Sequence, residues 1–266
     1  MSMVDVIDGA SFPRLEPIAC PLCGQSNPAR VIAARFGMLT SVAECPPCRL
    51  AYQTPRPSEE ASRAYMNWRW SSGDSYVTDS ENKRRAARAK MAHVQEVRPL
   101  PGRLLDFGAG SGAFVRASLD AGWQAIGVEQ SEAAIARARE YYGVELQATL
   151  PDEEFDVITM WDVVEHLRDP LSVLRLLHDR LRREGVLLLE TGNYENWRRV
   201  LEGERWSLYL LDHHFYFSPQ SAGASISSTT TSTSRRTAWR RSSRVPASPP
   251  SGYSTSTTRR PRCAAR

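Results

Sequence analysis

A short apolar strand that leads directly into a glycine-rich turn is the feature that most constrains this chain of 266 residues. Residues 103–107 read RLLDF, residues 108–112 read GAGSG, and an amphipathic stretch from Ala113 to Ala121 follows. Glycine adopts positive φ at low cost and lets the backbone approach a ligand closely. The start of a helix also offers free N–H groups to an anionic ligand group. The pattern predicts a strand, a ligand-binding turn and a helix.

Short apolar runs and amphipathic runs alternate after this turn. The expected strands are residues 103–107, 124–128, 144–146, 155–160 and 186–190, and the expected helices are residues 113–121, 131–142 and 170–183. Two further helices are expected upstream, one beginning after Ser58 and one over residues 80–97. Alternation at this spacing predicts an α/β fold with a parallel sheet that is covered on both faces.

Two carboxylates flank the glycine turn. Asp106 precedes the turn, and Glu129 follows the second expected strand. Both lie at carboxyl ends of parallel strands, where such sheets bind ligands, and Glu129 is placed to accept hydrogen bonds from ribose hydroxyls. A nicotinamide or flavin site is an alternative, but its pattern is Gly-x-Gly-x-x-Gly, whereas this chain has Gly-x-Gly-x-Gly.

Over residues 100–220 the sequence resembles the class I S-adenosylmethionine-dependent methyltransferases. The resemblance is carried by LDFGAGSG at 105–112, GVE at 127–129, FDVITMWDVVEHL at 155–167 and the segment 181–190. It implies a Rossmann-like sheet, S-adenosyl-L-methionine as cofactor, and methyl transfer to a small-molecule or sugar-like acceptor. The cofactor-binding residues that it implies are Asp106, Gly108, Ala109, Gly110, Gly112, Glu129, Met160 and Trp161.

Three histidines are candidates for removing a proton from the acceptor, because the pKa of histidine lies near neutrality. His166 follows the fourth expected strand, and His213 and His214 lie in an aromatic segment before a Phe-Ser pair. A role in steadying the next loop is the alternative for His166, and a polar pair on an aromatic, partly exposed surface is the alternative for His213 and His214. The aromatic side chains of residues 194–217 could line an acceptor pocket or pack in the core.

Four cysteines form two Cys-x-x-Cys pairs near the amino terminus. The pairs are Cys20 with Cys23 and Cys45 with Cys48. In a reducing compartment such pairs indicate metal ligands, and four thiolates suit a closed, structural Zn²⁺ site. Redox chemistry is the alternative, but neither pair begins a helix in a βαβ context. We therefore expect a zinc-ribbon-like module over residues 17–56.

Charge is distributed unevenly along the chain. Residues 221–266 hold nine arginines and no Lys, Asp or Glu, so the 34 basic and 30 acidic residues of the chain leave 25 and 30, a net charge of −5, in residues 1–220. The negative net charge of residues 1–220 does not indicate specific nucleic-acid binding, which requires a basic surface. The Ser-, Thr-, Arg- and Pro-rich tail predicts disorder and the loss of the last strands of the sheet. A frameshifted or truncated reading frame and a genuine basic tail are the two interpretations.

Together these patterns predict four segments: a zinc-ribbon-like module at 17–56, a helical linker at 57–99, a cofactor-binding methyltransferase domain at 100–220, and a disordered tail at 221–266. No apolar run is long enough to span a bilayer, and the amino terminus lacks a secretory signal, so we expect a cytoplasmic enzyme without a membrane partner. A nicotinamide-linked oxidoreductase and a non-catalytic cofactor-binding remnant are the alternative functions.

Overall fold

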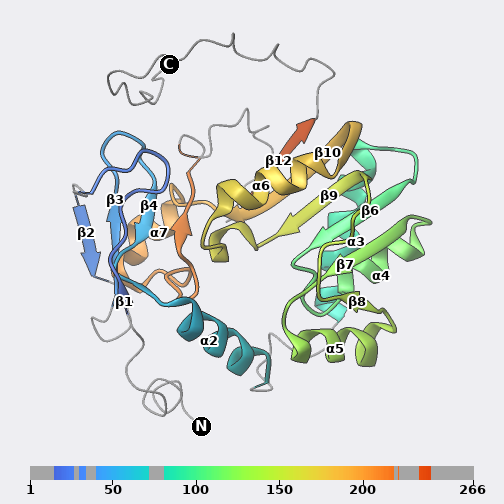
Figure 1. Cartoon of the computed structure of the whole chain (residues 1–266), viewed down its shortest axis with the longest axis horizontal. Helices are drawn as coiled ribbons and strands as arrows, with labels where there is room; N and C mark the ends of the chain where they lie inside the picture. Colours follow the sequence, from blue (N-terminus) through green and yellow to red (C-terminus); the bar gives the residue numbers. More distant parts are fainter. Residues whose placement is uncertain are drawn as a thin grey trace.

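A six-stranded sheet forms the centre of the computed structural model (Figure 1), which describes residues 15–26, 30–33, 40–71, 81–218, 221 and 234–240. The strand order is β12-β10-β9-β6-β7-β8. The five strands from β10 to β8 are parallel, and β12 pairs antiparallel with β10. The strands of this sheet are β6 (Arg103–Phe107), β7 (Gln124–Val128), β8 (Leu146–Gln147), β9 (Phe155–Trp161), β10 (Leu181–Gly192) and β12 (Ser234–Arg240). The α/β fold predicted from the sequence is confirmed.

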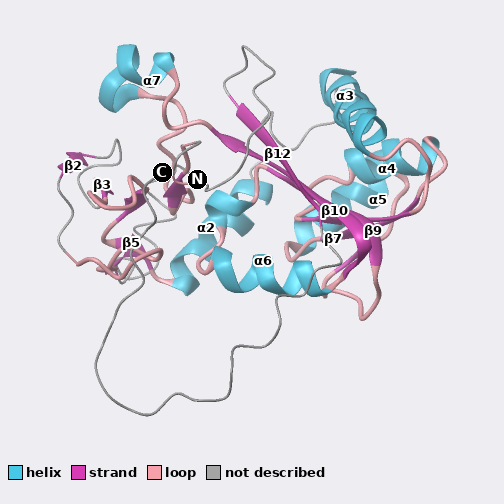
Figure 2. Cartoon of the chain, turned by 90° about the horizontal axis from the view of Figure 1, so that it is seen from above, coloured by secondary structure: helices cyan, strands magenta, loops and turns pink. Residues whose placement is uncertain are grey.

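Helices cover both faces of this sheet (Figure 2). The described residues form the helices α2 (Glu59–Ser71), α3 (Glu81–Val97), α4 (Ala113–Asp120), α5 (Glu132–Tyr142), α6 (Pro170–Asp179) and α7 (Trp197–Glu202), with short 3₁₀ turns at Val164–His166 (η1) and Gly203–Arg205 (η2). Helices α3 and α4 pack on one face with Leu104 and Val157, and α6 packs on the other with Leu105 and Ile158. Adjacent residues of one strand therefore belong to opposite cores, as the pleat requires.

A second sheet combines three strands from the amino-terminal segment with one strand that follows β10. Its order is β11-β4-β3-β2, made by β2 (Arg30–Ala33), β3 (Ser41–Glu44), β4 (Ala51–Gln53) and β11 (Phe215–Tyr216). A further two-stranded pair links β1 (Leu15–Glu16) to β5 (Arg56–Pro57). Because β11 pairs antiparallel with β4, residues that follow β10 complete the sheet formed by the cysteine segment, residues 17–56.

The helix starts follow from capping side chains. The Ser58 hydroxyl accepts a hydrogen bond from Ala61 N at 3.3 Å, and Ser131 Oγ accepts one from Ala134 N at 3.4 Å. Gly143 ends α5 in the left-handed region at φ 61°. These caps agree with the boundaries expected from the sequence.

Two expectations differ from the structure. Helix α6 ends at Asp179 rather than Arg183, because the chain enters β10 at Leu181 and passes through an irregularity in register before Val186. Within the tail expected to be disordered, Ser234–Arg240 forms β12, which pairs with Val186–Gly192 along the edge expected to stay unpaired. Strand β10 offers a long open edge, and edge pairing depends on backbone groups more than on composition. The other tail residues, apart from Ser221, lie outside the described residues.

Shortening a buried side chain of the central strand β6 should test whether both faces of the sheet pack into hydrophobic cores. Leu105 lies in β6 and has no exposed surface, so Leu105→Ala should lower the free energy of unfolding by about 2–5 kcal/mol through lost burial and a cavity. The matched control is Leu176→Ala on α6, whose side chain is 45% exposed and whose loss should cost much less. Urea unfolding followed by circular dichroism measures both, and equal losses would contradict the assigned core.

Candidate functional site

The glycine turn between β6 and α4 is tightly enclosed. A Cβ on Gly108 would lie 2.5 Å from Val163 Cγ2, and a Cβ on Gly112 would lie 2.5 Å from Val144 Cγ2. Both glycines have positive φ, at 77° and 79°. Gly110 also has positive φ, and Trp70 of α2 lies above it, 3.2 Å from the position of a Cβ. The sequence therefore needs glycine here for both conformation and space.

Most backbone N–H groups of this turn already have acceptors inside the protein. Gly108 N and Ala109 N both donate to Val128 O at 2.9 Å, and Gly112 N donates to Ala109 O at 2.9 Å. Gly110 N donates to Glu129 Oε2 at 3.0 Å. A dinucleotide site needs such N–H groups free for a pyrophosphate. The arrangement therefore disfavours the dinucleotide alternative.

The Glu129 carboxylate organises the turn as well as facing the site. Its Oε1 accepts hydrogen bonds from Gln130 N at 2.8 Å and from Ser131 N at 2.9 Å, in addition to the Gly110 contact made by Oε2. Each carboxylate oxygen has two lone-pair directions, so Oε2 keeps capacity for a ligand hydroxyl. Glu129 therefore holds Gly110 in position and, at the same site, offers an oxygen to the ribose expected there.

Asp106 is a buried carboxyl at the carboxyl end of β6. It is 2% exposed, and Thr159 Oγ1 donates to its Oδ1 at 2.8 Å. Burial raises the pKa of Asp106 to about 7, although the Thr159 hydrogen bond and the charge of Lys90 act in the opposite direction. Such a group is poised to respond to a cationic ligand group placed beside it.

Lys90 of α3 reaches the same end of the sheet, which no sequence pattern indicated. Its Nζ lies 3.4 Å from Glu190 Oε1 and 3.7 Å from Asp162 Oδ2, and 5.0 Å from the centroid of the Trp161 ring. Burial raises the pKa of Asp162, and the charge of Lys90 opposes that shift. In a helix rich in Ala, Arg and Lys, this lysine is indistinguishable by pattern from solvated ones. Met160, beside Trp161, is fully buried in β9.

Two of the three candidate histidines meet a glutamate. Glu165, His166 and His213 each offer a potential ligand atom within 4.8 Å of the others. The chain passes from the glycine turn's neighbour Val163, whose side chain lies against Gly108, directly into η1 and so to Glu165 and His166. Burial raises the pKa of Glu165 to about 7. The sequence does not place Glu165 beside His213, because their approach requires tertiary structure.

His214 has different surroundings. It is 1% exposed, its Nδ1 lies 3.3 Å from Gln53 Oε1, and its backbone N donates to Glu165 O at 2.7 Å. Burial lowers the pKa of His214 to about 3, and nearby positive charges act in the same direction. This neutral imidazole joins the cysteine segment to η1 instead of facing the cluster.

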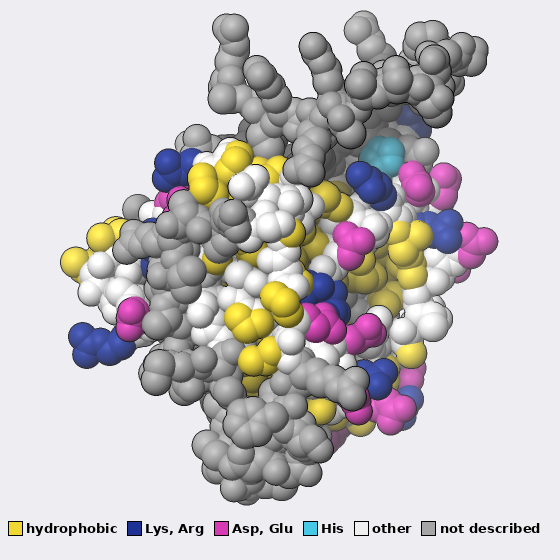
Figure 3. Space-filling model, turned by 60° about the vertical axis from the view of Figure 1, so that its left-hand side comes forward, with side chains coloured by type: hydrophobic (Ala, Val, Ile, Leu, Met, Phe, Trp, Pro, Cys, Tyr) yellow, Lys and Arg dark blue, Asp and Glu magenta, His cyan; other side chains and the backbone are white. Residues whose placement is uncertain are grey.

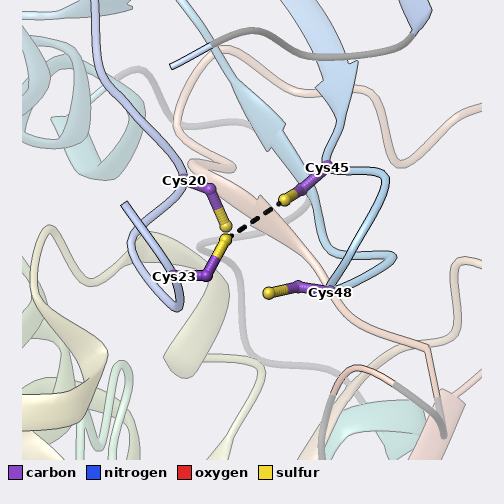
Figure 4. A group of neighbouring side chains, drawn as sticks. All are labelled: Cys20, Cys23, Cys45 and Cys48. Atoms are coloured by element: carbon purple, nitrogen blue, oxygen red, sulfur yellow. Dashed lines mark hydrogen bonds between the residues drawn. The ribbon is translucent and has the colours of Figure 1, made fainter. Parts of the chain in front are cut away.

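The four paired cysteines converge as the spacing predicts (Figure 4). Their sulfur atoms all lie within 4.8 Å of one another, with Cys23 Sγ and Cys45 Sγ 3.5 Å apart, and all four are reduced. Each pair forms the same turn: Gly24 N donates to Cys20 O and Arg49 N donates to Cys45 O, both at 2.7 Å. Gly24 and Arg49 both have positive φ. Two such turns present four thiols to one point and fit a tetrahedral metal ion.

The aromatic segment after β10 is mainly a packing element. Tyr194, Trp206, Tyr209 and Tyr216 are buried together and contact Val42 and Ala51 of the second sheet. The structure thus favours core packing over an aromatic acceptor wall for these four residues. Trp197 is the exception, at 67% exposed on α7.

Comparison with known proteins identifies the family. A family model described as a methyltransferase domain matches residues 79–223. The chain belongs to this family. Its class I resemblance, predicted from the glycine turn and the strands around it, is confirmed.

Relatives differ in the reactions that their names record. The ubiquinone biosynthesis O-methyltransferase of Ruegeria pomeroyi is 35% identical over 108 residues, which cover 36% of this chain and 44% of the relative. The tRNA U34 carboxymethyltransferase of Cronobacter sakazakii is 29% identical over 212 residues, covering 68% of this chain and 65% of the relative. The chain spans about half the length of the first curated relatives that it matches.

Solved structures include the magnesium protoporphyrin IX methyltransferase of Synechocystis with bound SAH. It has a TM-score of 0.49 and 18% identity, covering 68% of this chain and 95% of that chain. Among the described residues, no helix combines the length and apolar character that a membrane span needs.

The cysteine cluster should hold one zinc ion per chain. Cys48→Ser should lower the zinc content by one equivalent relative to the wild type, because the fourth thiolate of a closed site is lost. Cys263→Ser, which changes a cysteine outside the two pairs, is the matched control and should leave the zinc content unchanged. Elemental analysis of protein purified without chelators measures both. Equal zinc in wild type and Cys48→Ser would contradict a four-thiolate site.

Proposed function

We propose that this chain transfers a methyl group from S-adenosyl-L-methionine to a small-molecule acceptor. The observation that carries the proposal is the enclosed glycine turn, flanked by a buried Asp106 and by Glu129, in a chain that belongs to a methyltransferase family. When bound, the cofactor supplies an electrophilic methyl group. The protein holds the acceptor in line with that group and promotes loss of an acceptor proton.

Each part of the turn fits the expected cofactor. Gly108, Gly110 and Gly112 let the turn pack closely against neighbouring side chains, and Asp106 supplies a carboxyl for the amine of the methionyl part. Glu129 supplies acceptor oxygens for the ribose. Ala109 and the backbone at Met160 and Trp161 line the same edge of the sheet. These assignments are proposals for each residue.

We place removal of the acceptor proton at the cluster of Glu165, His166 and His213. Glu165 and His166 belong to η1, which begins directly after Val163, a neighbour of the glycine turn, and this supports the assignment. His214 is a weaker candidate than the other two, because it is buried against Gln53 and its pKa lies far below neutrality.

A small-molecule acceptor fits the charge of the protein better than a nucleic acid does. Residues 1–220 carry a net charge of −5, from 25 basic and 30 acidic residues. On the face drawn in Figure 3, Lys and Arg side chains are interspersed with Asp and Glu, and the described side chains there form no continuous basic surface. A sugar-like acceptor is the more specific form of the proposal. Four aromatic side chains that could have lined a sugar pocket pack in the core of the described residues and do not support it.

Removing the Glu129 carboxylate should weaken cofactor binding. Glu129→Ala should reduce the affinity for S-adenosylhomocysteine by about 1–3 kcal/mol, because a charged acceptor and the brace on Gly110 are both lost. Glu132→Ala is the matched control, an exposed glutamate in the first turn of the adjacent helix α5. Calorimetric titration measures both variants. An unchanged affinity in Glu129→Ala would remove this residue from the site.

Cofactor binding should depend on pH through Asp106. Its pKa of about 7 means that the carboxyl is largely protonated below neutrality, whereas a cationic amine binds the ionised form. The affinity for S-adenosylhomocysteine should therefore rise roughly ten- to thirtyfold between about pH 5.5 and about pH 7.5. Asp106→Asn cannot ionise and should bind weakly with a flat profile over this interval. A rise of the same size in Asp106→Asn would assign the dependence to another group.

A further inference from the structure

Three side chains from two distant segments form a cluster at η1 that is separate from the cysteine cluster. Glu165 and His166 belong to η1, and His213 comes from the segment before β11. The two histidine rings are in edge-to-face contact, with centroids 4.7 Å apart. The hydrogen bond from His214 N to Glu165 O, at 2.7 Å, fixes the second segment beside the first.

One oxygen of this cluster is buried without a hydrogen-bond partner. Glu165 is 3% exposed, and its Oε2 makes no hydrogen bond with the described part of the protein. Leaving a carboxylate oxygen buried and unsatisfied is costly, and native proteins satisfy such atoms with a donor, a water or a cation. An occupant of the cluster would remove this cost.

His166 is oriented as a metal ligand would be. Its Nδ1 lies 2.8 Å from the carbonyl oxygen of Asp212. Asp212 Oδ2 lies 3.4 Å from the same nitrogen. A carbonyl oxygen only accepts, so Nδ1 is the donor in this contact, and Nε2 is the ring nitrogen left for a ligand. Histidines that bind metals commonly donate their other ring N–H to a carbonyl or carboxylate in this way.

We propose that Glu165, His166 and His213 bind one divalent first-row transition-metal cation. Two imidazoles and one carboxylate are a donor set typical of Zn²⁺, Fe²⁺ and related ions in sites with an open coordination position. Donors that share one cation at about 2.0–2.2 Å lie roughly 3–4 Å apart. Three potential ligand atoms within 4.8 Å of one another therefore need only small side-chain rotations to close on an ion.

An open position would give the cation a part in the reaction, and this part of the inference rests on the proposed function. An acceptor hydroxyl bound there would lose its proton to solvent more readily, while the electron pair stays on the oxygen. The cluster would then activate the acceptor by stabilising negative charge rather than by accepting the proton on a histidine.

Cobalt titration tests the site directly. The wild-type protein is first saturated with Zn²⁺ at the cysteine cluster and freed of excess metal, and Co²⁺ is then titrated with calorimetry and visible absorption. Co²⁺ does not displace Zn²⁺ from thiolates, because zinc binds such sites more tightly. We expect one further equivalent of Co²⁺ to bind, with d–d absorption and without a thiolate-to-cobalt charge-transfer band.

Variants identify the ligands. Glu165→Gln and His213→Ala should each weaken Co²⁺ binding at least about tenfold. His178→Ala is the matched control, since this histidine lies on α6 with its side chain 58% exposed and should leave binding unchanged. Thermal unfolding checks that each variant is folded, and His166→Ala is measured in place of any variant that is not. Absence of a second equivalent in the wild type, or equal affinity in the ligand variants and the control, would overturn the proposal.

Cofactor binding separates this proposal from the proposed function. S-adenosylhomocysteine binding is measured on the same samples by calorimetry. Cobalt binding without cofactor binding would overturn the methyltransferase proposal and support the metal site. Cofactor binding without cobalt binding would overturn the metal site alone and leave His166 or His213 to act as a general base.

Discussion

Burial of both faces of the parallel sheet is the constraint on which the rest of the structure depends. Strands β6, β9 and β10 carry apolar side chains toward two cores, so neither face can hold polar groups cheaply. Polar chemistry is thereby confined to the carboxyl edge, where the strands end. Asp106, Asp162 and Glu190 all lie there, and Lys90 offsets part of their charge.

The sequence predicted the local features of this edge well, because each depends on residues close together in the chain. A strand that meets Gly108 and Gly112 can only turn sharply, and Ser131 with Gly143 marks the limits of one helix. The cysteine pairs were equally readable, since the spacing within each pair sets the shape of its turn. Such features can be predicted because the residues that form the sequence pattern are the same residues that determine the local backbone conformation.

Contacts between residues far apart in the sequence could not be predicted in this way. The meeting of Glu165 with His213 and the reach of Lys90 to Glu190 are products of tertiary packing. The pairing of β12 with β10 was missed because composition reports on burial, whereas an open strand edge recruits backbone groups from a segment of almost any composition. The aromatic segment was ambiguous by pattern, and only its contact with the second sheet identified it as packing.

The second sheet combines amino-terminal strands with β11, which follows β10 in the chain, and this limits the order in which the sheet can assemble during synthesis. Its strands β2, β3 and β4 and all four paired cysteines are complete within the first 53 residues, whereas β11 is made only at Phe215. Domains fold from the amino terminus as the chain emerges, and contacts between distant residues form late. The two cysteine turns can therefore form early, while the outer strand of their sheet and the buried His214 arrive after most of the large sheet has been made. Closure of this small sheet is a late event that depends on the near-completion of the larger one.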